Sequence, residues 1–420
     1  MGIVYYMQGI LAKRFNILII PAGFFIIIFQ IVISIYPSLA GYQNEHNFKI
    51  RILSKYSLDS VELKIIKGYI KMIPNSEFQI PNSHLNFTIH AHGEKINIYN
   101  GLKYVTVKKL QLLSADKMLL KNTTFCVSAN KVTGLNRTYK GELEIFSRHN
   151  KLILINTLNL EEYLKSVVSS EMPFNNIEAL KAQAVVSRTY ALTKSDKHNK
   201  DGYNFCDTTC CQVYYGADAE NKQGRTAINL TQGEILEYKG RLIEIFYHST
   251  CGGFLADNHD VFKGKKLPYY LEKQDRIKGE SEDNCKASPH YSQWEVTYSS
   301  EQILKALKKY YKITKIIDIK IIDSSPKDIA KEVEIKTPAG GLRLDGYTFW
   351  QTCASNLGWG GIKSINFKIY KKNNFYTFKG QGLGHLVGLC QWGAYGMALK
   401  GKTYKQILLH YFPKTQMFRK

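Results

Sequence analysis

Apolar and polar residues alternate along the chain from about residue 48 to residue 155. Stretches such as FTIHAHGEKINIY, KYVTVKKLQLL and GELEIFSRHNKLILIN carry apolar side chains at nearly every second position, with Gly, Asn and Asp between them. A period of two is typical of strands that bury one face, and those residues favour turns. The pattern predicts a strand-rich N-terminal region, which we delimit as residues 41–140.

A helical period replaces the alternation at Asn159. Asn159 followed by Glu162 is a capping pattern, and apolar residues follow at helical spacing: Leu160, Tyr163, Leu164, Val167 and Val168. Pro173 ends this helix, because proline cannot continue one. Asn175 with Glu178 predicts the cap of a second helix, whose buried stripe is Ile177, Leu180, Ala184 and Val185.

The rest of the chain mixes both periods. LTQGEILEYKGRLIEIFYHSTCGG predicts strands that end in a glycine turn, and residues 296–375 predict strands with one amphipathic helix near 301–309. A glycine-rich loop, a short helix and a final helix capped by Thr403 follow. We therefore predict an α+β fold, in which residues 141–412 form a domain with its helical segment beside a mixed β/α body that forms a groove.

The first forty residues differ from the rest. Lys13 and Arg14 precede the uncharged run FNILIIPAGFFIIIFQIVISIYPSLA, which ends in Ser38-Leu39-Ala40. A basic start, an apolar centre and a small-x-small end are typical of an export signal. We expect residues 1–40 to be cleaved after Ala40 or retained as a membrane anchor. The protein would then work in the cell envelope, in the periplasm or at the cell surface.

The chain is strongly basic, with 57 Lys and Arg against 35 Asp and Glu and a formal net charge of +22. These basic residues are spread along the chain, which argues against a nucleic-acid partner. The charge fits attraction to an anionic surface or polymer, or solubility alone.

Three of the eight cysteines crowd into six residues, close to a histidine. His198, Cys206, Cys210 and Cys211 lie within fourteen residues. Thiolates and an imidazole suit tetrahedral zinc, and four protein ligands would make such a site structural. The spacing is not that of a standard zinc finger, so a disulfide or free thiols stay open as alternatives.

Cys251 in STCGG and His385 in GLGH form a second candidate pair. A cysteine activated by a histidine would make a thiol hydrolase. A disulfide between Cys251 and Cys285 is the simpler explanation in an exported protein, and we favour it.

Glu171 stands in SSEMP, at the break between the two predicted helices. The negative end of the helix dipole disfavours a carboxylate there, and burial would raise its pKa further. A carboxyl that stays protonated near neutral pH is a candidate general acid. A surface glutamate at a frayed helix end is the alternative.

Five motifs, in this order, resemble those of the SpoIID/LytB family: SSEMP, EALKAQAVVSRTYAL, CQVYYG, STCGG and GHLVGLCQWGAYGMA. The resemblance spans roughly residues 141–412. It implies a peptidoglycan lytic transglycosylase with Glu171 as catalytic acid and base. Such an enzyme cleaves glycan strands between MurNAc and GlcNAc and leaves 1,6-anhydroMurNAc ends.

This chemistry activates no water, so it does not need the second carboxylate of other glycosidases. If a second carboxylate were needed, the candidates are Asp207, Asp257 and Asp260. The alternative that the same resemblance implies is a non-enzymatic amidase enhancer, which binds and activates a cell-wall hydrolase. Sporulation itself does not follow from the sequence.

The resemblance also implies the residues that line the glycan site: Lys181, Gln183, Arg188, Tyr190, Tyr247, Ser249, His385 and Gln391. For each of them, packing within the fold is the alternative role. Some members of the family hold zinc in the loop before the CQVY-like motif, which favours structural zinc at His198, Cys206, Cys210 and Cys211.

Three positions depart from the family's pattern. Leu386 and Cys390 stand where the family usually has Gly and Ser, and Trp350 stands where an Arg is frequent. These departures concern the substrate preference more than the acid.

Overall fold

The structure, a computed structural model, describes residues 46–67, 69–73, 76–79, 85–101, 104–113, 124–129, 131–358 and 361–419. The expected signal or anchor, residues 1–40, lies outside them. Within the described residues, no helix is both long and apolar enough to cross a membrane. All elements below belong to one unit, Asn47–Lys420.

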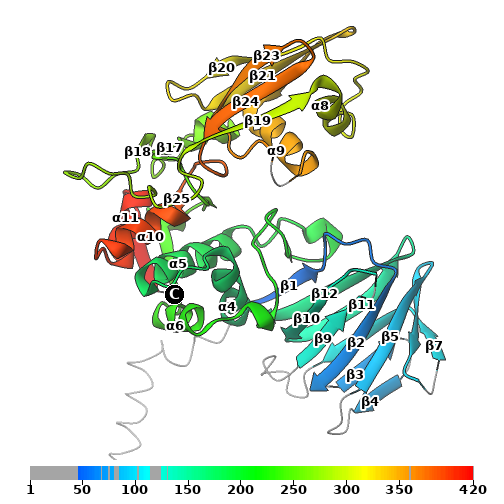
Figure 1. Cartoon of the computed structure of the whole chain (residues 1–420). Helices are drawn as coiled ribbons and strands as arrows, with labels where there is room; N and C mark the ends of the chain where they lie inside the picture. The colour runs from blue at the N-terminus through cyan, green and yellow to red at the C-terminus, as the bar shows by residue number, and fades with distance from the viewer. Residues whose placement is uncertain are drawn as a thin grey trace, which may run out of the picture. The chain divides into compact units, whose positions relative to one another are not determined.

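The predicted α+β class is confirmed, and the regular elements of the described residues from Asn47 to Asn159 are strands (Figure 1). One sheet has the order β13 (Phe205–Cys206), β1 (Asn47–Ile52), β12 (Lys151–Asn159), β11 (Glu142–Arg148), β8 (Lys109–Leu113), β3 (Tyr69–Ile73) and β4 (Ser76–Gln79). The other has the order β10 (Asn136–Lys140), β9 (Thr124–Ser128), β2 (Ser60–Lys67), β5 (Leu85–His92), β6 (Lys95–Tyr99) and β7 (Tyr104–Val107).

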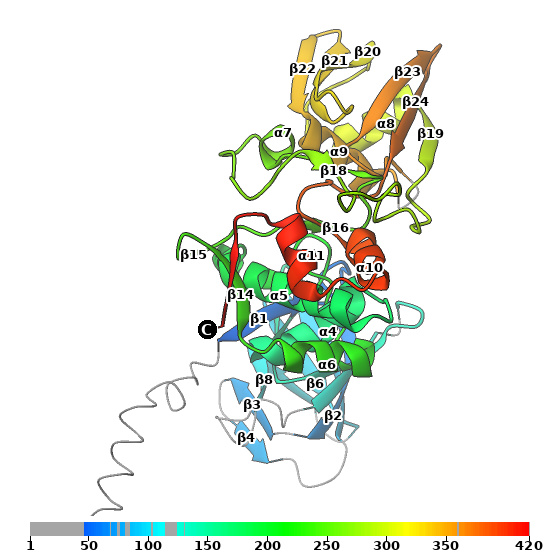
Figure 2. The same ribbon diagram turned by 90° about the vertical axis from the view of Figure 1, so that its left-hand side faces the viewer.

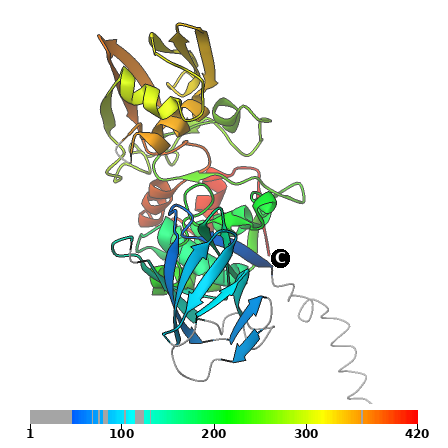
Figure 3. The same cartoon turned by 90° about the vertical axis from the view of Figure 1, so that its right-hand side faces the viewer.

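The alternation seen in the sequence decides which face of each strand is buried. In β2, Val61, Leu63 and Ile65 are buried while their neighbours face outward. Leu143 and Ile145 of β11 belong to the same apolar core. The two sheets therefore share one core, and Figure 3 shows their blue and cyan strands from a third side. Burying one face of each strand is what stabilises this pair of sheets.

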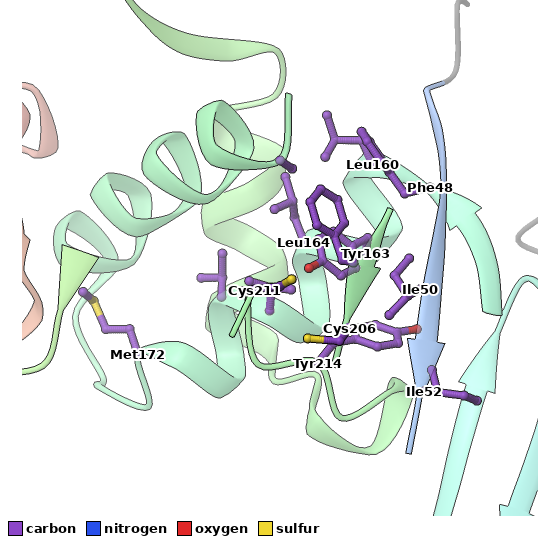
Figure 4. Packing of buried hydrophobic residues seen from close by; sticks show 14 of the residues in the cluster. Phe48, Ile50, Ile52, Leu160, Tyr163, Leu164, Met172, Cys206, Cys211 and Tyr214 are labelled. Carbon is purple, nitrogen blue, oxygen red and sulfur yellow. The ribbon is translucent and has the colours of Figure 1, made fainter. Parts of the chain in front are cut away.

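The strand β1 joins this region to the helices. It pairs antiparallel with β12 along its whole length, from Asn47 opposite Asn159 to Ile52 opposite Leu154. Figure 4 shows Phe48, Ile50 and Ile52 on β1 near Leu160, Tyr163 and Leu164 of the helix α4 (Leu160–Glu171). The domain boundary that we predict between residues 140 and 141 stays a prediction.

Helix α5 (Ile177–Thr193) is the most enclosed helix of the site. The helices that contact it are α4, α6 (Lys222–Leu230), α10 (Gln391–Leu399) and α11 (Tyr404–Tyr411) (Figure 2). Ala179, Ala182 and Ala184 are fully buried, and their small side chains let these neighbours approach closely. Its N-cap is Asn176, whose side chain accepts from the backbone N–H groups of Glu178 and Ala179. The predicted cap at Asn175 is thus wrong by one residue.

Short elements connect the helices. They are the 3₁₀ turns η2 (Asn199–Asp201) and η3 (Ala217–Ala219), the sheet β15 (Arg241–Leu242), β14 (Glu234–Tyr238) and β26 (Gln416–Arg419), the pair β17 (Phe254–Leu255) and β18 (Lys273–Gln274), and α7 (Asn258–Phe262). The pair that matters most for the site is β16 (Tyr247–His248) with β25 (Leu389–Cys390), which are parallel.

Residues 293–381 enclose a second apolar core. Its strands are β19 (Gln293–Ser299), β24 (Phe375–Gln381) and β23 (Phe367–Lys372) in one sheet, and β20 (Asp318–Ser324), β21 (Ala330–Thr337) and β22 (Gly340–Asp345) in another. Helix α8 (Ser300–Leu307) begins with a capping box of Ser299 and Gln302, which confirms the helix predicted near residue 301. Helix α9 (Gly346–Asn356) was not predicted.

Candidate active site

Glu171 is the last residue of α4. The helix begins where Asn159 accepts a hydrogen bond from the backbone N–H of Glu162, as the sequence predicts. It ends before Met172 and Pro173, because proline cannot continue a helix. The half-buried Glu171 side chain therefore lies at the carboxyl end of a well-formed helix, where the dipole disfavours a negative charge.

Two donors hold the Glu171 carboxyl group. The backbone N–H of Val213 donates to Oε1 at 2.6 Å, and the Tyr247 hydroxyl donates to the same oxygen at 3.1 Å. Burial raises the pKa of Glu171 to about 7, against the opposite effect of these hydrogen bonds. The hydrogen bonds from Val213 and Tyr247 both end at Oε1.

Two residues of the predicted glycan site contact Glu171, and two more lie beside them. Gln391 Nε2 donates to the backbone carbonyl of Glu171 at 2.9 Å, and Tyr247 contacts its carboxyl group. The Tyr190 ring lies 6.2 Å from the Tyr247 ring, centre to centre. Ser249 follows on the same stretch of chain as Tyr247, and its carbonyl accepts from the backbone N–H of Trp392. Tyr247 and Gln391 thus contact the end of α4, and Tyr190 and Ser249 lie next to them.

Gln183 and His385, two further residues of the predicted glycan site, contact other residues than Glu171. Gln183 donates to the hydroxyl of Ser187, and its own Oε1 is buried with no hydrogen-bond partner among the described residues. The ring of His385 lies against Phe262 and His248, at 5.4 Å and 5.5 Å between ring centres. Burial, and next the neighbouring His248, lower the pKa of His385 to about 3, so that its imidazole is neutral at physiological pH.

Two predicted glycan-binding residues have partners elsewhere in the fold. The guanidinium of Arg188 is 1% exposed, bonds to both carboxylate oxygens of Glu161 at 2.7 Å and 2.8 Å, and donates to the carbonyl of Glu234. Lys181 pairs with Glu178 at 2.7 Å, and its ammonium lies over the Tyr404 ring. These contacts hold α5 to its neighbours, and a contact of either residue with glycan stays a prediction.

The structure brings His198, Cys206, Cys210 and Cys211 together, and we call them the loop cluster. One ligand atom from each lies within 4.8 Å of all the others. Four ligands about 2.3 Å from a central ion would be about 3.8 Å apart in a tetrahedron. Figure 4 shows Cys206 and Cys211 near Tyr163 and Tyr214, while Cys210 is exposed. The loop cluster is thus half in the core and half at the surface.

The histidine of the loop cluster is oriented for a metal. His198 Nδ1 lies 3.5 Å from a carboxylate oxygen of Asp201. Its Nε2 is buried and has no hydrogen-bond partner among the described residues. An imidazole that is held by a carboxylate through one nitrogen and free at the other is the usual arrangement of a zinc-ligating histidine. These residues therefore fit zinc.

Val213 contacts the candidate acid, and the sequence gives no prediction for it. It acts through its backbone N–H, which has no side-chain signature, although it lies in the quoted motif CQVYYG. Gln212 precedes it, and its side chain lies beside Tyr247. Cys211 of the loop cluster directly precedes these two residues, so the loop cluster adjoins the segment that donates to Glu171.

The alternative pairs of Cys251 come out differently from the expectation. Cys251 Sγ lies 3.4 Å from Cys285 Sγ, and both are free thiols, so the favoured disulfide is not formed. His385 contacts Phe262 and His248, whereas Cys251 Sγ contacts Asp275 and Cys285. Nothing in these contacts pairs Cys251 with His385 as a thiol hydrolase would require.

The candidate second carboxylates are all engaged in the fold. Asp207 accepts from the backbone N–H groups of Leu53 and Ser54 at 2.7 Å and 3.1 Å. Asp257 caps α7, and Asp260 pairs with Lys331 at 2.8 Å. These contacts give each of them a structural role.

Two of the three departing positions are buried. Leu386 is 1% exposed and has φ of 63°, in the left-handed region that favours glycine. Cys390 caps α10, where its sulfur accepts from the backbone N–H of Gly393. Trp350 is half-buried and donates to the carbonyl of Ile362.

Comparisons with known proteins identify what the chain resembles. The family model described as Stage II sporulation protein (SpoIID) matches residues 148–238, which include Glu171, Val213 and the loop cluster. An uncharacterised protein of Brachyspira hyodysenteriae is 34% identical over 276 residues, 65% of this chain and 70% of that protein. The amidase enhancer of Bacillus subtilis is 30% identical over 60% of this chain and 40% of its own length. Stage II sporulation protein D of Bacillus amyloliquefaciens is 28% identical over 61% of this chain and 74% of its own length.

Proposed function

This chain belongs to the SpoIID/LytB family, and on that premise we propose that it is an exported lytic transglycosylase of peptidoglycan. The family and the amidase enhancer among the relatives support a role at the cell wall. The proposed substrate is the glycan strand, an extended polymer that carries acidic groups. The net charge of +22 would favour its approach.

The observation that supports the reaction is the environment of Glu171. Its carboxyl group is held by the Val213 N–H and the Tyr247 hydroxyl, and its pKa is raised to about 7 by burial. A general acid works best when its pKa is near the operating pH, because it must both hold and release the proton. Glu171 meets that condition without a second carboxylate beside it.

The proposed reaction uses the Glu171 carboxyl group twice, first as acid and then as base. Protonated Glu171 donates to the glycosidic oxygen as the bond to C1 of MurNAc breaks, and the GlcNAc hydroxyl leaves. The Glu171 carboxylate then takes the proton of the C6 hydroxyl of the same MurNAc. The C6 oxygen bonds to C1 and closes the 1,6-anhydro ring, so no water is consumed. Tyr247 and Val213 would keep Oε1 in place while Oε2 exchanges the proton.

We further propose that the loop cluster holds a structural zinc ion through His198, Cys206, Cys210 and Cys211. With four protein ligands the ion would have no open position for substrate. Its contribution would be to hold in one conformation the loop that ends in Gln212 and Val213. The Val213 N–H would then meet Glu171 at a fixed place.

The direct test is mass spectrometry of purified glycan strands, with and without stem peptides, after incubation with the protein. Products ending in 1,6-anhydroMurNAc are expected, and Glu171→Gln should not form them. Reducing ends would instead mean hydrolysis and would contradict the proposed ring closure. The matched control is Glu162→Gln, which changes a carboxylate of the same helix that is paired with Lys165.

The match to the amidase enhancer of Bacillus subtilis favours a second function, the activation of a cell-wall amidase. In that case Glu171→Gln should still accelerate release of stem peptides by a purified wall amidase, and no glycan cleavage should occur. Loss of both effects in the variant would speak for the enzymatic function.

A further inference from the structure

A second group of metal-binding side chains lies outside the loop cluster. Cys251, Asp275, Cys285 and Cys390 are all buried, and one ligand atom from each lies within 4.8 Å of all the others. We call them the core cluster. Cys251 Sγ lies 3.4 Å from Cys285 Sγ and 3.2 Å from Asp275 Oδ2. Cys251 and Cys390 are 139 residues apart in the chain, so only the fold brings them together.

The groups around the core cluster hold its ligands in place. The backbone N–H groups of Cys251 and Gly393 both donate to Cys390 Sγ at 3.3 Å. Cys390 also caps α10, whose positive end favours a thiolate. Hydrogen bonds of this kind orient ligand sulfurs and stabilise their charge when a metal is bound.

The carboxylate of the core cluster is held in the same way. Asp275 Oδ1 accepts from Asn284 Nδ2 at 2.9 Å and from the Tyr411 hydroxyl at 3.0 Å, and His410 Nε2 lies 3.0 Å away. A fully buried carboxylate needs such partners or a cation. Oδ2 lies 3.2 Å from the sulfur of Cys251 and 3.1 Å from the Tyr411 hydroxyl, which thus lies between the two carboxylate oxygens.

The space beside the core cluster at Gly393 is too small for a side chain. A Cβ atom at this position would lie 2.4 Å from Asp275 Oδ2 and 2.1 Å from the Tyr411 hydroxyl. Any larger residue would therefore have to displace the Asp275 carboxylate or the Tyr411 hydroxyl. The start of α10 can approach Asp275 only because residue 393 is a glycine.

A disulfide explains this arrangement less well than a metal does. One disulfide would use two of the three sulfurs and leave the third beside a buried carboxylate. The sulfurs of Cys251 and Cys285 are 3.4 Å apart, well beyond a bond of about 2.05 Å. Three thiolates and one carboxylate within one tetrahedron are instead a ligand set that suits zinc.

We propose that Cys251, Asp275, Cys285 and Cys390 bind a zinc ion in a closed, four-ligand site. The site is separate from the loop cluster, and the proposal does not depend on the transglycosylase reaction. Cys390 adjoins Gln391, which donates to the Glu171 carbonyl, and β25 pairs with β16, which carries Tyr247. The ion would thus hold together two segments that contact Glu171.

The test is the zinc content of the full chain, purified under reducing conditions with zinc present and separated from loosely bound metal. One zinc ion per cluster is expected, two in all. The double variant Cys206→Ser/Cys210→Ser breaks the loop cluster and should keep one ion. Adding Asp275→Asn or Cys390→Ser to it should remove that ion as well. Cys353→Ala is the matched control, because Cys353 is a buried thiol in neither cluster, and it should keep both ions.

Cobalt gives a second measurement that needs no change in the core cluster. Co²⁺ added to the metal-free Cys206→Ser/Cys210→Ser variant should produce thiolate-to-cobalt charge-transfer absorption. A variant with no zinc and no such absorption would overturn the proposal. So would a Cys251–Cys285 disulfide in peptide mapping, or full zinc content after Asp275→Asn. None of these measurements involves glycan cleavage, so a failed transglycosylase assay leaves the result unaffected.

Discussion

The two clusters of candidate metal ligands are alike in chemistry and different in construction. The loop cluster comes from fourteen consecutive residues and has an exposed member, Cys210. The core cluster comes from a span of 139 residues and is wholly buried. Closing a loop ten times longer costs about 2 kcal/mol more in chain entropy. The fold therefore has to be largely complete before the core cluster can assemble, whereas the loop cluster can form locally.

Both clusters adjoin a segment that contacts Glu171. Cys211 of the loop cluster precedes Gln212 and Val213, and Cys390 of the core cluster precedes Gln391. The difference in construction implies a division of labour. With zinc bound as we propose, the loop cluster would position the donor to the carboxyl group, and the core cluster would position the donor to the backbone of the same residue.

The largest expected effect comes from removing the group that both clusters support. Glu171→Gln should lower the rate of glycan cleavage by about 10²–10⁴-fold, the usual contribution of a general acid or base. The measurement is the initial rate of formation of 1,6-anhydroMurNAc ends, with Glu162→Gln as control. If a variant that breaks either cluster lost more activity than Glu171→Gln while remaining folded, the carboxyl group would not be the centre of the site.

The next effect distinguishes the clusters by stability. Cys390→Ser should lower the free energy of unfolding by roughly 3 kcal/mol or more, because no water can replace a ligand in the buried core cluster. Cys210→Ser should lower it by roughly 1 kcal/mol, because water can take the exposed position. Urea unfolding of the zinc-loaded proteins measures both, and Cys353→Ala reports the cost of losing a buried sulfur alone. Equal losses for Cys210→Ser and Cys390→Ser would erase the distinction.

A smaller effect follows from the pKa of Glu171. Its folded value of about 7 lies above the ordinary value of 4.5, so the folded protein retains a proton that the unfolded chain releases. Stability should therefore fall as pH rises from about 4.5 through 7, by roughly 2 kcal/mol after allowance for partial exposure. Glu171→Gln should lack this loss and be the more stable protein at pH 8.

The rate of glycan cleavage should also depend on whether Glu171 is protonated. The rate should fall as pH rises through about 7, because only protonated Glu171 can donate to the glycosidic oxygen. Unfolding and initial rates measured from pH 5 to 9 check both curves. A rate that stays constant above pH 7 would contradict Glu171 as the acid.

The smallest effect concerns a residue that lies in neither cluster. Lys181 pairs with Glu178 at the half-exposed surface of α5, and such pairs contribute about 0.2–0.5 kcal/mol. Lys181→Met should therefore change stability by no more than that and change KM by about twofold at most. A rise in KM of about tenfold would instead show that Lys181 contacts the glycan.

Much of the fold near the site follows from local patterns. Asn159 and Glu162 predict the start of α4, and the alternation of apolar residues in the sequence predicts which residues of β2 are buried. The partner of β1 is not visible, because strand pairing depends on residues far apart in the chain. Helix α9 was missed because GYTFWQTCASN is rich in residues of low helix propensity, and its packing against a second core decides its conformation.

The site divides in the same way. Glu171, Tyr247 and Gln391 were found through motifs, and the structure brings them into contact. Val213 was missed because any residue except proline can offer a backbone N–H. The core cluster was missed because its members are far apart in the sequence, and the carboxylate of Asp275 is one of many. Only the fold shows that it meets three sulfurs.

The pairing of β1 with β12 sets an order for the synthesis of the chain. Asn47 leaves the ribosome more than a hundred residues before its partner Asn159, which at 5–20 residues per second is a delay of roughly 6–20 s. During that time β1 has an unsatisfied hydrogen-bonding edge that a chaperone can protect. Once β12 has arrived, α4 follows at the next residue, Leu160. The helix that ends in Glu171 is thus synthesised just after β12, the strand that pairs with β1.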